Sequence, residues 1–374
     1  MKSSLRGRKV LFFSFCFFIL VKLAFAQEDW RVAWERTVEA AKKEGRVVLF
    51  CSDDYDILFR EFQKKYPGIK VEAVTTANVP GVWQRVLSER RAEKYLMDVY
   101  LGGATTGYAL YNVKALDPIK PALVLPEILD ASKWWKEGKY NYSDSEGTHL
   151  FSFNGELQAY FAYNTKLVNP AEIRSYWDFL NPKWKKRMVV FDPTVTAPIA
   201  TPLRFIYYHP ELGPEFLKRL LTEMELVPSR DFRQISDWLV VGKFALSLFT
   251  SISRLDLDVA KKQGLPVDWF GPKSLKEGAI LSNAQGNVAF FNRAPHPNAA
   301  KVAINWLLSR EGQIAYQKNW NGRHDSLRID VPKDDIQPYA RRTEDVPYVV
   351  TERPDWIDIE PISKLVNQAW KNRN

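Results

Sequence analysis

Short apolar runs alternate with stretches of helical periodicity along the first part of the chain. Residues 47–51 (VVLFC) are wholly apolar, which is typical of a strand buried on both faces of a sheet. Apolar residues recur at helical spacing within residues 30–43, and Gly45 is placed to end that helix. The same alternation predicts further strands at residues 69–74 and 97–101, with helices between them. Strands separated by helices favour right-handed crossovers and a parallel sheet.

The alternation of strands and helices restarts beyond Phe153 and changes again near residue 285. From Asn319 onward the chain is polar and contains several prolines, as in a tail that wraps existing structure. After the restart, the predicted strands are residues 160–163, 188–191 and 245–249, and the predicted helices are residues 214–221 and 232–241.

Two lobes account for both changes in the pattern. A chain of 374 residues is too long for a single hydrophobic core, so a division into two domains is expected. The first lobe is predicted to contain residues 27–158 and 285–318. The second lobe is predicted to contain residues 159–284 and 319–374.

The amino-terminal residues 1–26 have the three parts of a secretory signal peptide. A basic head precedes an uncharged run at residues 10–21, and residues 23–26 (LAFA) end in the small–x–small pattern that a signal peptidase reads. The apolar run stops at Lys22, short of the ~20 residues that a membrane span needs. We therefore expect cleavage after Ala26 and a periplasmic protein. An uncleaved amino-terminal anchor is the alternative.

Removal of this segment changes the charge and the cysteine content. It takes away five basic residues and no acidic residue, so the net charge falls from +9 to +4. A mature chain with this charge lacks the basic footprint of a nucleic-acid-binding protein. Cys51 is the single cysteine left, so no intrachain disulfide can form. Stability must therefore come from ordinary hydrophobic cores.

Several longer segments occur in the order found in one protein family. They are residues 40–49 (AAKKEGRVVL), 62–71 (FQKKYPGIKV), 163–168 (YNTKLV), 177–185 (WDFLNPKWK), 294–301 (APHPNAAK) and 309–313 (SREGQ). Together they resemble the solute-binding proteins of ABC importers (extracellular solute-binding family 1), in the ferric-iron-binding-protein subgroup. The resemblance implies an α/β, two-lobed periplasmic-binding-protein type II fold, in which each lobe is a mostly parallel sheet flanked by helices. It also implies a two-stranded hinge and a ligand closed between the lobes.

The resemblance implies the substrate-binding component of an ABC importer. Such a protein captures a small polar solute between its lobes and delivers it to the permease in the inner membrane. We expect a monomer with no cofactor, no nucleic-acid partner and no enzymatic activity. A periplasmic hydrolase is the second alternative, but neither a G-x-S-x-G nor a G-x-x-x-x-G-K-[ST] motif occurs. The chain has four histidines, and none of them forms a metal-type pair at short spacing: His149, His209, His296 and His324.

Four predicted loops at strand ends carry the candidate ligand-binding residues. In open parallel sheets, a ligand lies beyond the carboxyl ends of the strands. These loops hold glycine or small hydroxylic residues directly before a helix, where unpaired N–H groups and the positive end of the helix dipole suit an anion. Ordinary helix capping is the alternative for any one loop. The candidate residues are Ser52, Asp53, Gly103, Ala104, Thr105, Asp192, Thr194, Thr196, Thr250 and Ser251, together with Tyr163.

The residue types in this set favour a small solute that carries a carboxylate, a phosphonate or a similar oxyanion. The carboxylate of Asp53 would repel an anion unless it meets an amine on the same ligand. A zwitterion such as an aminophosphonate or an amino acid is therefore a natural solute, and a polyamine is the main rival. Tyr163 is a candidate for contact with the apolar part of the solute, with a position in the core as its alternative.

The chain departs from the iron-binding pattern of the resembled subgroup. The place of the subgroup's adjacent tyrosine ligands is occupied by Phe249 and Thr250, and the place of its glutamate by Gly102. Its first-loop histidine is absent where Ser52 and Asp53 stand. Ferric iron prefers anionic oxygen donors, which phenylalanine and glycine cannot supply. We therefore predict that no metal is bound, and a ferric-iron or iron-chelate binding protein is the first alternative.

Overall fold

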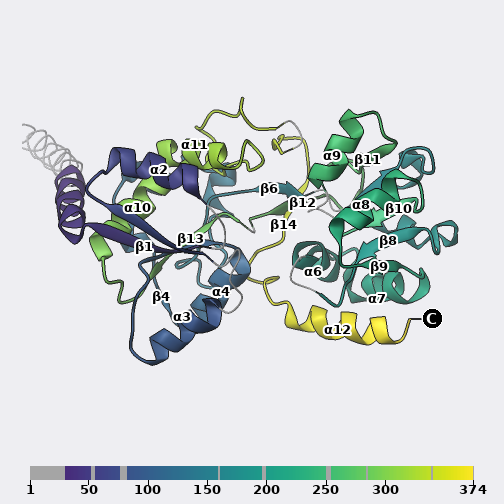
Figure 1. Cartoon of the computed structure of the whole chain (residues 1–374), viewed down its shortest axis with the longest axis horizontal. Helices are drawn as coiled ribbons and strands as arrows, with labels where there is room; N and C mark the ends of the chain where they lie inside the picture. The colour runs from purple at the N-terminus through teal and green to yellow at the C-terminus, as the bar shows by residue number, and fades with distance from the viewer. Residues whose placement is uncertain are drawn as a thin grey trace, which may run out of the picture.

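The computed structural model describes residues 30–51, 55–75, 82–158, 161–195, 199–249, 254–283, 285–337 and 340–373. Two groups of helices and strands lie side by side along the longest axis of the molecule, with short strands between them (Figure 1). The first described helix covers residues 30–44, and Gly45 follows it with the positive φ of 74° that glycine adopts most readily. Among the helices within these ranges, none has the length and apolar content that crossing a membrane requires.

The first lobe is built on a six-stranded sheet. The strands are β1 (Arg46–Cys51), β2 (Lys70–Thr75), β3 (Val99–Gly102), β4 (Leu116–Asp117), β5 (Phe151–Ser152) and β13 (Asn287–Phe291). Their spatial order is β2-β1-β3-β13-β4, with β5 also paired to β13. The parallel pairing of β1 with β2 and β3 confirms the sequence prediction. β13 runs antiparallel to β3, which the sequence pattern did not reveal because this strand returns directly from the other lobe.

Helices cover both faces of this sheet, with α2 and α11 above it and α3 and α4 below it in Figure 1. Successive residues of a strand point to opposite faces. Val47 and Leu49 of β1 accordingly join the core shared with α2 and α10, whereas Phe50 joins the core shared with α3 and α4. The helices are α2 (Asp56–Lys65), α3 (Val82–Arg91), α4 (Ala104–Asn112), α5 (Pro126–Leu129), α10 (Pro297–Leu308) and α11 (Arg310–Asn319), with 3-10 turns at Lys120–Ala122, Ala131–Lys133 and Trp135–Gly138.

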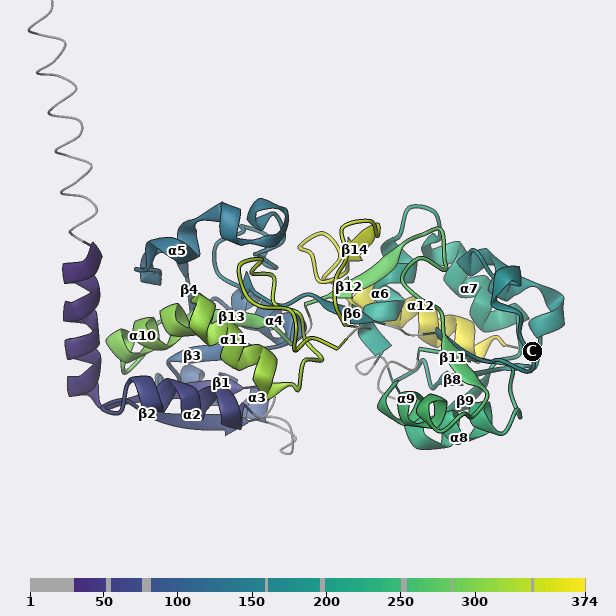
Figure 2. The same ribbon diagram turned by 90° about the horizontal axis from the view of Figure 1, so that it is seen from above.

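The second lobe is built on a five-stranded sheet in the order β11-β7-β10-β8-β9. The strands are β7 (Phe161–Asn164), β8 (Met188–Phe191), β9 (Val227–Ser229), β10 (Leu246–Leu248) and β11 (Val267–Trp269). β10, β8 and β9 are parallel, and β7 is antiparallel to β10 and β11. In Figure 2, α8 and α9 lie on one side of these strands and α7 lies on the other. The helices are α6 (Ala200–Tyr208), α7 (Gly213–Glu223), α8 (Phe232–Val240), α9 (Arg254–Lys262) and α12 (Glu360–Lys371), with 3-10 turns at Pro170–Glu172, Tyr176–Leu180 and Pro182–Trp184.

A three-stranded sheet connects the lobes. The expected pair of crossing strands is β6 (Glu156–Gln158) and β12 (Ala279–Ser282), which are antiparallel. The tail adds a third strand, β14 (Tyr348–Val350), parallel to β12. This hinge therefore contains one segment from the tail as well as the two crossing segments.

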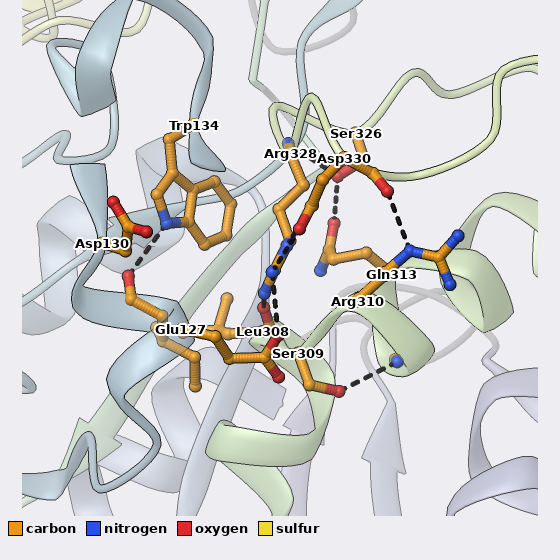
Figure 3. A network of polar contacts seen from close by, with 12 residues as sticks. Glu127, Asp130, Trp134, Leu308, Ser309, Arg310, Gln313, Ser326, Arg328 and Asp330 are labelled. Carbon is orange, nitrogen blue, oxygen red and sulfur yellow. Dashed lines mark hydrogen bonds and ion pairs between the residues drawn. The ribbon is translucent and has the colours of Figure 1, made fainter. Parts of the chain in front are cut away.

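The contacts of the tail differ from the expectation that residues 319–374 belong wholly to the second lobe. Its first part packs on the first lobe, where the amide of Leu327 donates to the carbonyl of Phe153 at 2.7 Å and the side chain of Arg328 is fully buried. Figure 3 shows Arg328 between the carboxylates of Glu127 and Asp330. Its last part forms α12, which packs on α7 and places Val366 in the core of the second lobe. The tail therefore links both lobes across the hinge.

Candidate functional site

The start of α4 lies directly beyond the carboxyl end of β3. Gly103 precedes the helix with extended backbone angles (φ −77°, ψ 143°) and offers no capping side chain. The first bond along the helix runs from the amide of Gly107 to the carbonyl of Gly103 at 3.0 Å. Within the described part of the chain, no side chain caps the amides of Ala104 and Thr105. This first turn therefore keeps N–H donors and a positive dipole end available to an anion.

Close packing fixes the position of this helix start. A Cβ atom at Gly107 would lie 2.5 Å from a methyl carbon of Leu150, so only glycine lets α4 pack this closely. The hydroxyl of Tyr100 donates to the carbonyl of Gly103 at 2.6 Å. Burial raises the pKa of Tyr100, so this hydroxyl stays protonated and keeps donating. The amide donors of the first turn are thus held on rigid elements.

Arg204 approaches the same helix start from the second lobe. It lies on α6 with only 1% of its surface exposed. Its Nη1 donates to Glu352 at 3.1 Å, and its Nη2 lies 3.4 Å from the hydroxyl oxygen of Thr105. Its Nε atom is buried without a hydrogen-bond partner in the described structure. A buried guanidinium and an uncapped helix start therefore converge on Thr105 from opposite lobes. We call Gly103, Ala104, Thr105 and Arg204 the interlobe site.

Glu352 holds Arg204 in place and is almost fully buried itself. One of its oxygens accepts from Arg204 and, at 2.8 Å, from the hydroxyl of Thr201. Its other oxygen accepts from the backbone amide of Asn283 at 3.1 Å and from the hydroxyl of Thr351 at 2.8 Å. Both oxygens are therefore bound, one to the second lobe and one to the hinge.

The polar network continues from the hinge into the first lobe. The Nδ2 atom of Asn283 donates to the hydroxyls of Ser143 and Ser152 at 3.0 and 2.8 Å. Asn287 on β13 accepts from Ser152 at 2.6 Å and donates to the carbonyl of Gly102 at 3.2 Å. A chain of buried polar contacts thus runs from α6 through the hinge to the end of β3. A pocket of about 240 Å³ borders this network beside Asn283 and Glu352.

Asp192 and Thr194 form a turn at the end of β8 that satisfies its own polar groups. The amide and hydroxyl of Thr194 donate to one carboxylate oxygen of Asp192 at 3.0 and 2.7 Å, and Arg230 donates to the other at 2.9 Å. Burial acts to raise the pKa of Asp192, but the hydrogen bonds from Thr194 and the ion pair with Arg230 outweigh it and lower the pKa. The structure therefore shows Asp192 ordering this loop.

Tyr163 lies in the core of the second lobe, which is the alternative that the sequence analysis left open for it. It pairs with Leu246 at the beginning of β10, whereas the carboxyl end of β10 at Leu248 pairs with Phe161. Its ring packs on Phe270 at a centroid distance of 4.9 Å. Because β7 runs antiparallel to β10, Tyr163 lies at the opposite end of the strand pair from Leu248. The remaining predicted site residues, Ser52, Asp53, Thr196, Thr250 and Ser251, lie outside the described residues.

The described residues contain no group of three or more histidine, cysteine, aspartate or glutamate side chains able to hold a metal ion. Phe249 is fully buried, with its ring 5.9 Å from that of Phe161. Among the histidines, His324 is buried against Trp320, and burial lowers its pKa to about 3. His324 is therefore neutral at physiological pH, and its ring hydrogen bonds to Asn154.

Arg204 and Glu352 were not among the residues singled out from the sequence. Arg204 is the single charged residue of α6, whose sequence ATPLRFIYY is otherwise apolar or small. A lone arginine within a buried helix needs a partner, and this pattern is the feature of the sequence that could have identified Arg204. Its partner lies in the tail, 148 residues further along the chain.

The chain matches one protein family and is similar to several solved structures. The family model described as "Bacterial extracellular solute-binding protein" matches residues 53–314. FutA (IdiA) from Trichodesmium, solved with iron and citrate, is similar at 20% identity and a TM-score of 0.62, over 88% of this chain and 98% of that chain. Apo FutA2 from Synechocystis matches at 14% identity and a TM-score of 0.67, over 87% of this chain and 99% of that chain.

A third similar structure holds a phosphorylated sugar. AfuA from Actinobacillus pleuropneumoniae, solved with fructose-6-phosphate bound, matches at 17% identity and a TM-score of 0.59, over 88% of this chain and 98% of that chain. At these identities the likeness establishes the fold, which is the two-lobed type II fold of periplasmic binding proteins.

Proposed function

Because the chain belongs to the bacterial extracellular solute-binding proteins, we propose that it is the substrate-binding component of an ABC importer for a small solute that carries an oxyanion. The solute binds between the lobes and is delivered to a permease in the inner membrane. The observation that carries this proposal is the convergence of the uncapped start of α4 and the buried Arg204 on Thr105.

The free energy of binding requires several hydrogen-bond donors to act together. A partly buried anion gains up to ~2 kcal/mol from one helix start, and a hydrogen bond to a charged group contributes about 1.5–3 kcal/mol. Micromolar affinity requires about 8 kcal/mol. Two or three such donors in addition to apolar contacts reach this value, and the interlobe site offers the amides of α4, the hydroxyl of Thr105 and the guanidinium of Arg204.

Two features bear on the class of solute. The phosphate of the sugar found in AfuA is an oxyanion of the kind that the interlobe site suits. We expect a carboxylate, phosphonate or phosphate group at Thr105. If Asp53 faces the same space, an amine on the solute would pair with it, so a zwitterion is the preferred form and a polyamine is the rival.

The protein acts in the periplasm as a monomer, after cleavage of the signal peptide following Ala26. The basic head, apolar run and LAFA sequence at residues 23–26 support this step. Amino-terminal sequencing of the protein from the periplasmic fraction is expected to begin at Gln27. Recovery of a chain that still begins at Met1 would contradict the cleavage.

Thermal-shift screening of the mature chain identifies the solute, because a ligand that binds only the native state raises the midpoint of unfolding. The screen contains carboxylates, aminophosphonates, sugar phosphates, polyamines and ferric citrate. Calorimetry then compares the wild type with Thr105→Val. Loss of one hydrogen bond to an anion lowers affinity by about tenfold.

The matched control is Thr222→Val, which removes an exposed hydroxyl that donates to the carbonyl of Lys218 on the outer surface of the second lobe. It is expected to leave affinity unchanged. Binding of a polyamine with no effect of Thr105→Val would contradict the oxyanion proposal. A visible charge-transfer band, together with stoichiometric iron in the purified mature chain, would instead support the iron alternative.

A further inference from the structure

A second polar pocket lies on the first lobe, away from the interlobe site. It has a volume of about 350 Å³ and is formed where α3 ends and where β13 ends. Four basic residues line it: Arg90, Arg91, Lys114 and Arg293. Tyr95, in the segment before β3, lines it as well. It therefore lies beyond the amino end of β3, whereas the interlobe site lies beyond the carboxyl end.

Among the residues that the structure describes, none of the four cations has a carboxylate within the 4.0 Å of an ion pair. Many other basic residues on the surface do form such pairs, for example Lys183 with Glu172 and Lys185 with Glu225. An unpaired cluster of this size gathers positive charge in one hollow.

Two of the guanidinium groups are held in fixed positions by one aromatic ring. The guanidinium carbons of Arg90 and Arg293 lie 5.1 and 4.8 Å from the ring centroid of Tyr95. Arg90 donates to the side chain of Asn292, and Arg293 donates to the hydroxyl of Tyr95. Asn292 is tied in turn to the carbonyl of Lys114 at 2.7 Å. These contacts leave most of the guanidinium N–H donors unused and reduce the entropy lost when an anion binds.

The local electrostatics favour an added anion. Burial is the main cause that lowers the pKa of Arg90, and the nearby charge of Arg293 lowers it as well, while Tyr95 and Asp117 act in the opposite direction. The like charges of the pocket therefore repel one another in a partly buried place. A bound anion with two negative charges would relieve this repulsion and accept several charge-assisted hydrogen bonds.

We propose that the pocket lined by Arg90, Arg91, Lys114 and Arg293 is a binding site for a phosphate-type dianion, separate from the interlobe site. Guanidinium groups match the geometry of phosphate oxygens in paired hydrogen bonds, and a dianion needs at least two cations to be neutralised. The phosphate group belongs either to a free phosphorylated solute or to an anionic phospholipid whose headgroup is a phosphomonoester.

The test uses the mature chain and inorganic phosphate as the probe, with binding followed by calorimetry at ~0.15 M salt. The variant Lys114→Gln/Arg293→Gln removes two exposed cations and is expected to weaken phosphate binding at least tenfold. The charge-matched control Lys218→Gln/Arg233→Gln removes two exposed cations from the second lobe and is expected to leave binding unchanged. Thr105→Val separates the two sites: phosphate binding that this variant weakens and Lys114→Gln/Arg293→Gln does not belongs to the interlobe site and counts against the proposal.

Vesicles distinguish the two sources of the phosphate group. Flotation is measured with phosphatidylcholine vesicles and with vesicles that also contain phosphatidic acid, whose phosphomonoester can carry two negative charges. Recruitment to the anionic vesicles that is lost in Lys114→Gln/Arg293→Gln assigns the site to a lipid headgroup, and phosphate binding without recruitment assigns it to a free solute. The proposal is overturned if neither phosphate nor anionic vesicles bind, or if the two double variants weaken binding equally.

Discussion

Replacing Glu352 with alanine is expected to lower the free energy of unfolding of the mature chain by about 3–5 kcal/mol. The change removes the only acidic partner that the described structure gives to Arg204, which is 99% buried and would keep its charge. Removing one member of a buried ion pair is strongly destabilising for this reason. Thr201 and the amide of Asn283 lose their acceptor as well. Urea unfolding followed by tryptophan fluorescence measures the difference.

The double variant Arg204→Met/Glu352→Leu tests this explanation. Replacing both members of a buried pair with apolar residues of similar volume is often close to neutral. We therefore expect the double variant to regain most of the stability lost in Glu352→Ala, and to lose affinity for the solute because Arg204 is absent.

Glu344→Ala is the matched control for the single variant. Its carboxylate pairs with Lys136 at 3.5 Å, but its side chain is 83% exposed. An exposed pair contributes at most about 1 kcal/mol. Equal stability of Glu352→Ala and Glu344→Ala would show that the buried pair does not hold the lobes and the tail together.

Replacing Arg328 with methionine is expected to lower the free energy of unfolding by about 2–4 kcal/mol. Arg328 donates to Asp330 through two bonds of 2.8 and 2.9 Å, to Glu127 at 2.9 Å and to the carbonyl of Leu308 at 2.9 Å (Figure 3). The two carboxylates are partly exposed and can be solvated, but the carbonyl of Leu308 would be left buried without this donor. Hydrogen bonds to charged groups contribute about 1.5–3 kcal/mol each, and an unsatisfied buried acceptor costs about 1–3 kcal/mol.

Arg310→Met provides the control for this change, because Arg310 is exposed and donates to the carbonyl of Asp330 at 2.8 Å. Its effect on the free energy of unfolding is expected to stay below about 1 kcal/mol.

The pKa of Asp330 is lowered chiefly by its hydrogen bond with Arg328. The stability that the Arg328–Asp330 pair contributes is therefore fully present above the unfolded pKa of about 3.9, and it is lost as the pH falls through the lower folded pKa. A difference between wild type and Arg328→Met that stays constant down to pH 2 would contradict this account.

Local patterns in the sequence were sufficient for the parallel strands and for the start of α4. The apolar run at residues 47–51 became β1, and Gly102 at the end of β3 and Gly103 after it led directly into a helix. The antiparallel strand β13 and the tail strand β14 depend on partners from distant parts of the chain, which no local window contains. α12 was also missed, although Ile362, Val366 and Ala369 form an apolar stripe. Pro361 stands in its first turn, where a helix tolerates proline.

The candidate site shows the same division between local and distant information. Gly103, Ala104 and Thr105 were chosen by the rule that ligands lie beyond strand ends, and they lie at the start of α4, directly after β3. For Tyr163 the sequence left two positions open, because the choice depends on the register of β7 against β10, which the sequence does not display. Arg204 and Glu352 come together only through the path of the tail across the hinge.

Small-angle X-ray scattering of the mature chain, with and without the solute found by the thermal-shift screen, tests the central claim most directly. Closure of two lobes around a bound ligand is a hinge motion that compacts the molecule. We predict a smaller radius of gyration when the oxyanion-bearing solute is present at saturating concentration. A saturated complex with the same radius of gyration as the free protein would contradict a clamp that closes on its solute between the lobes.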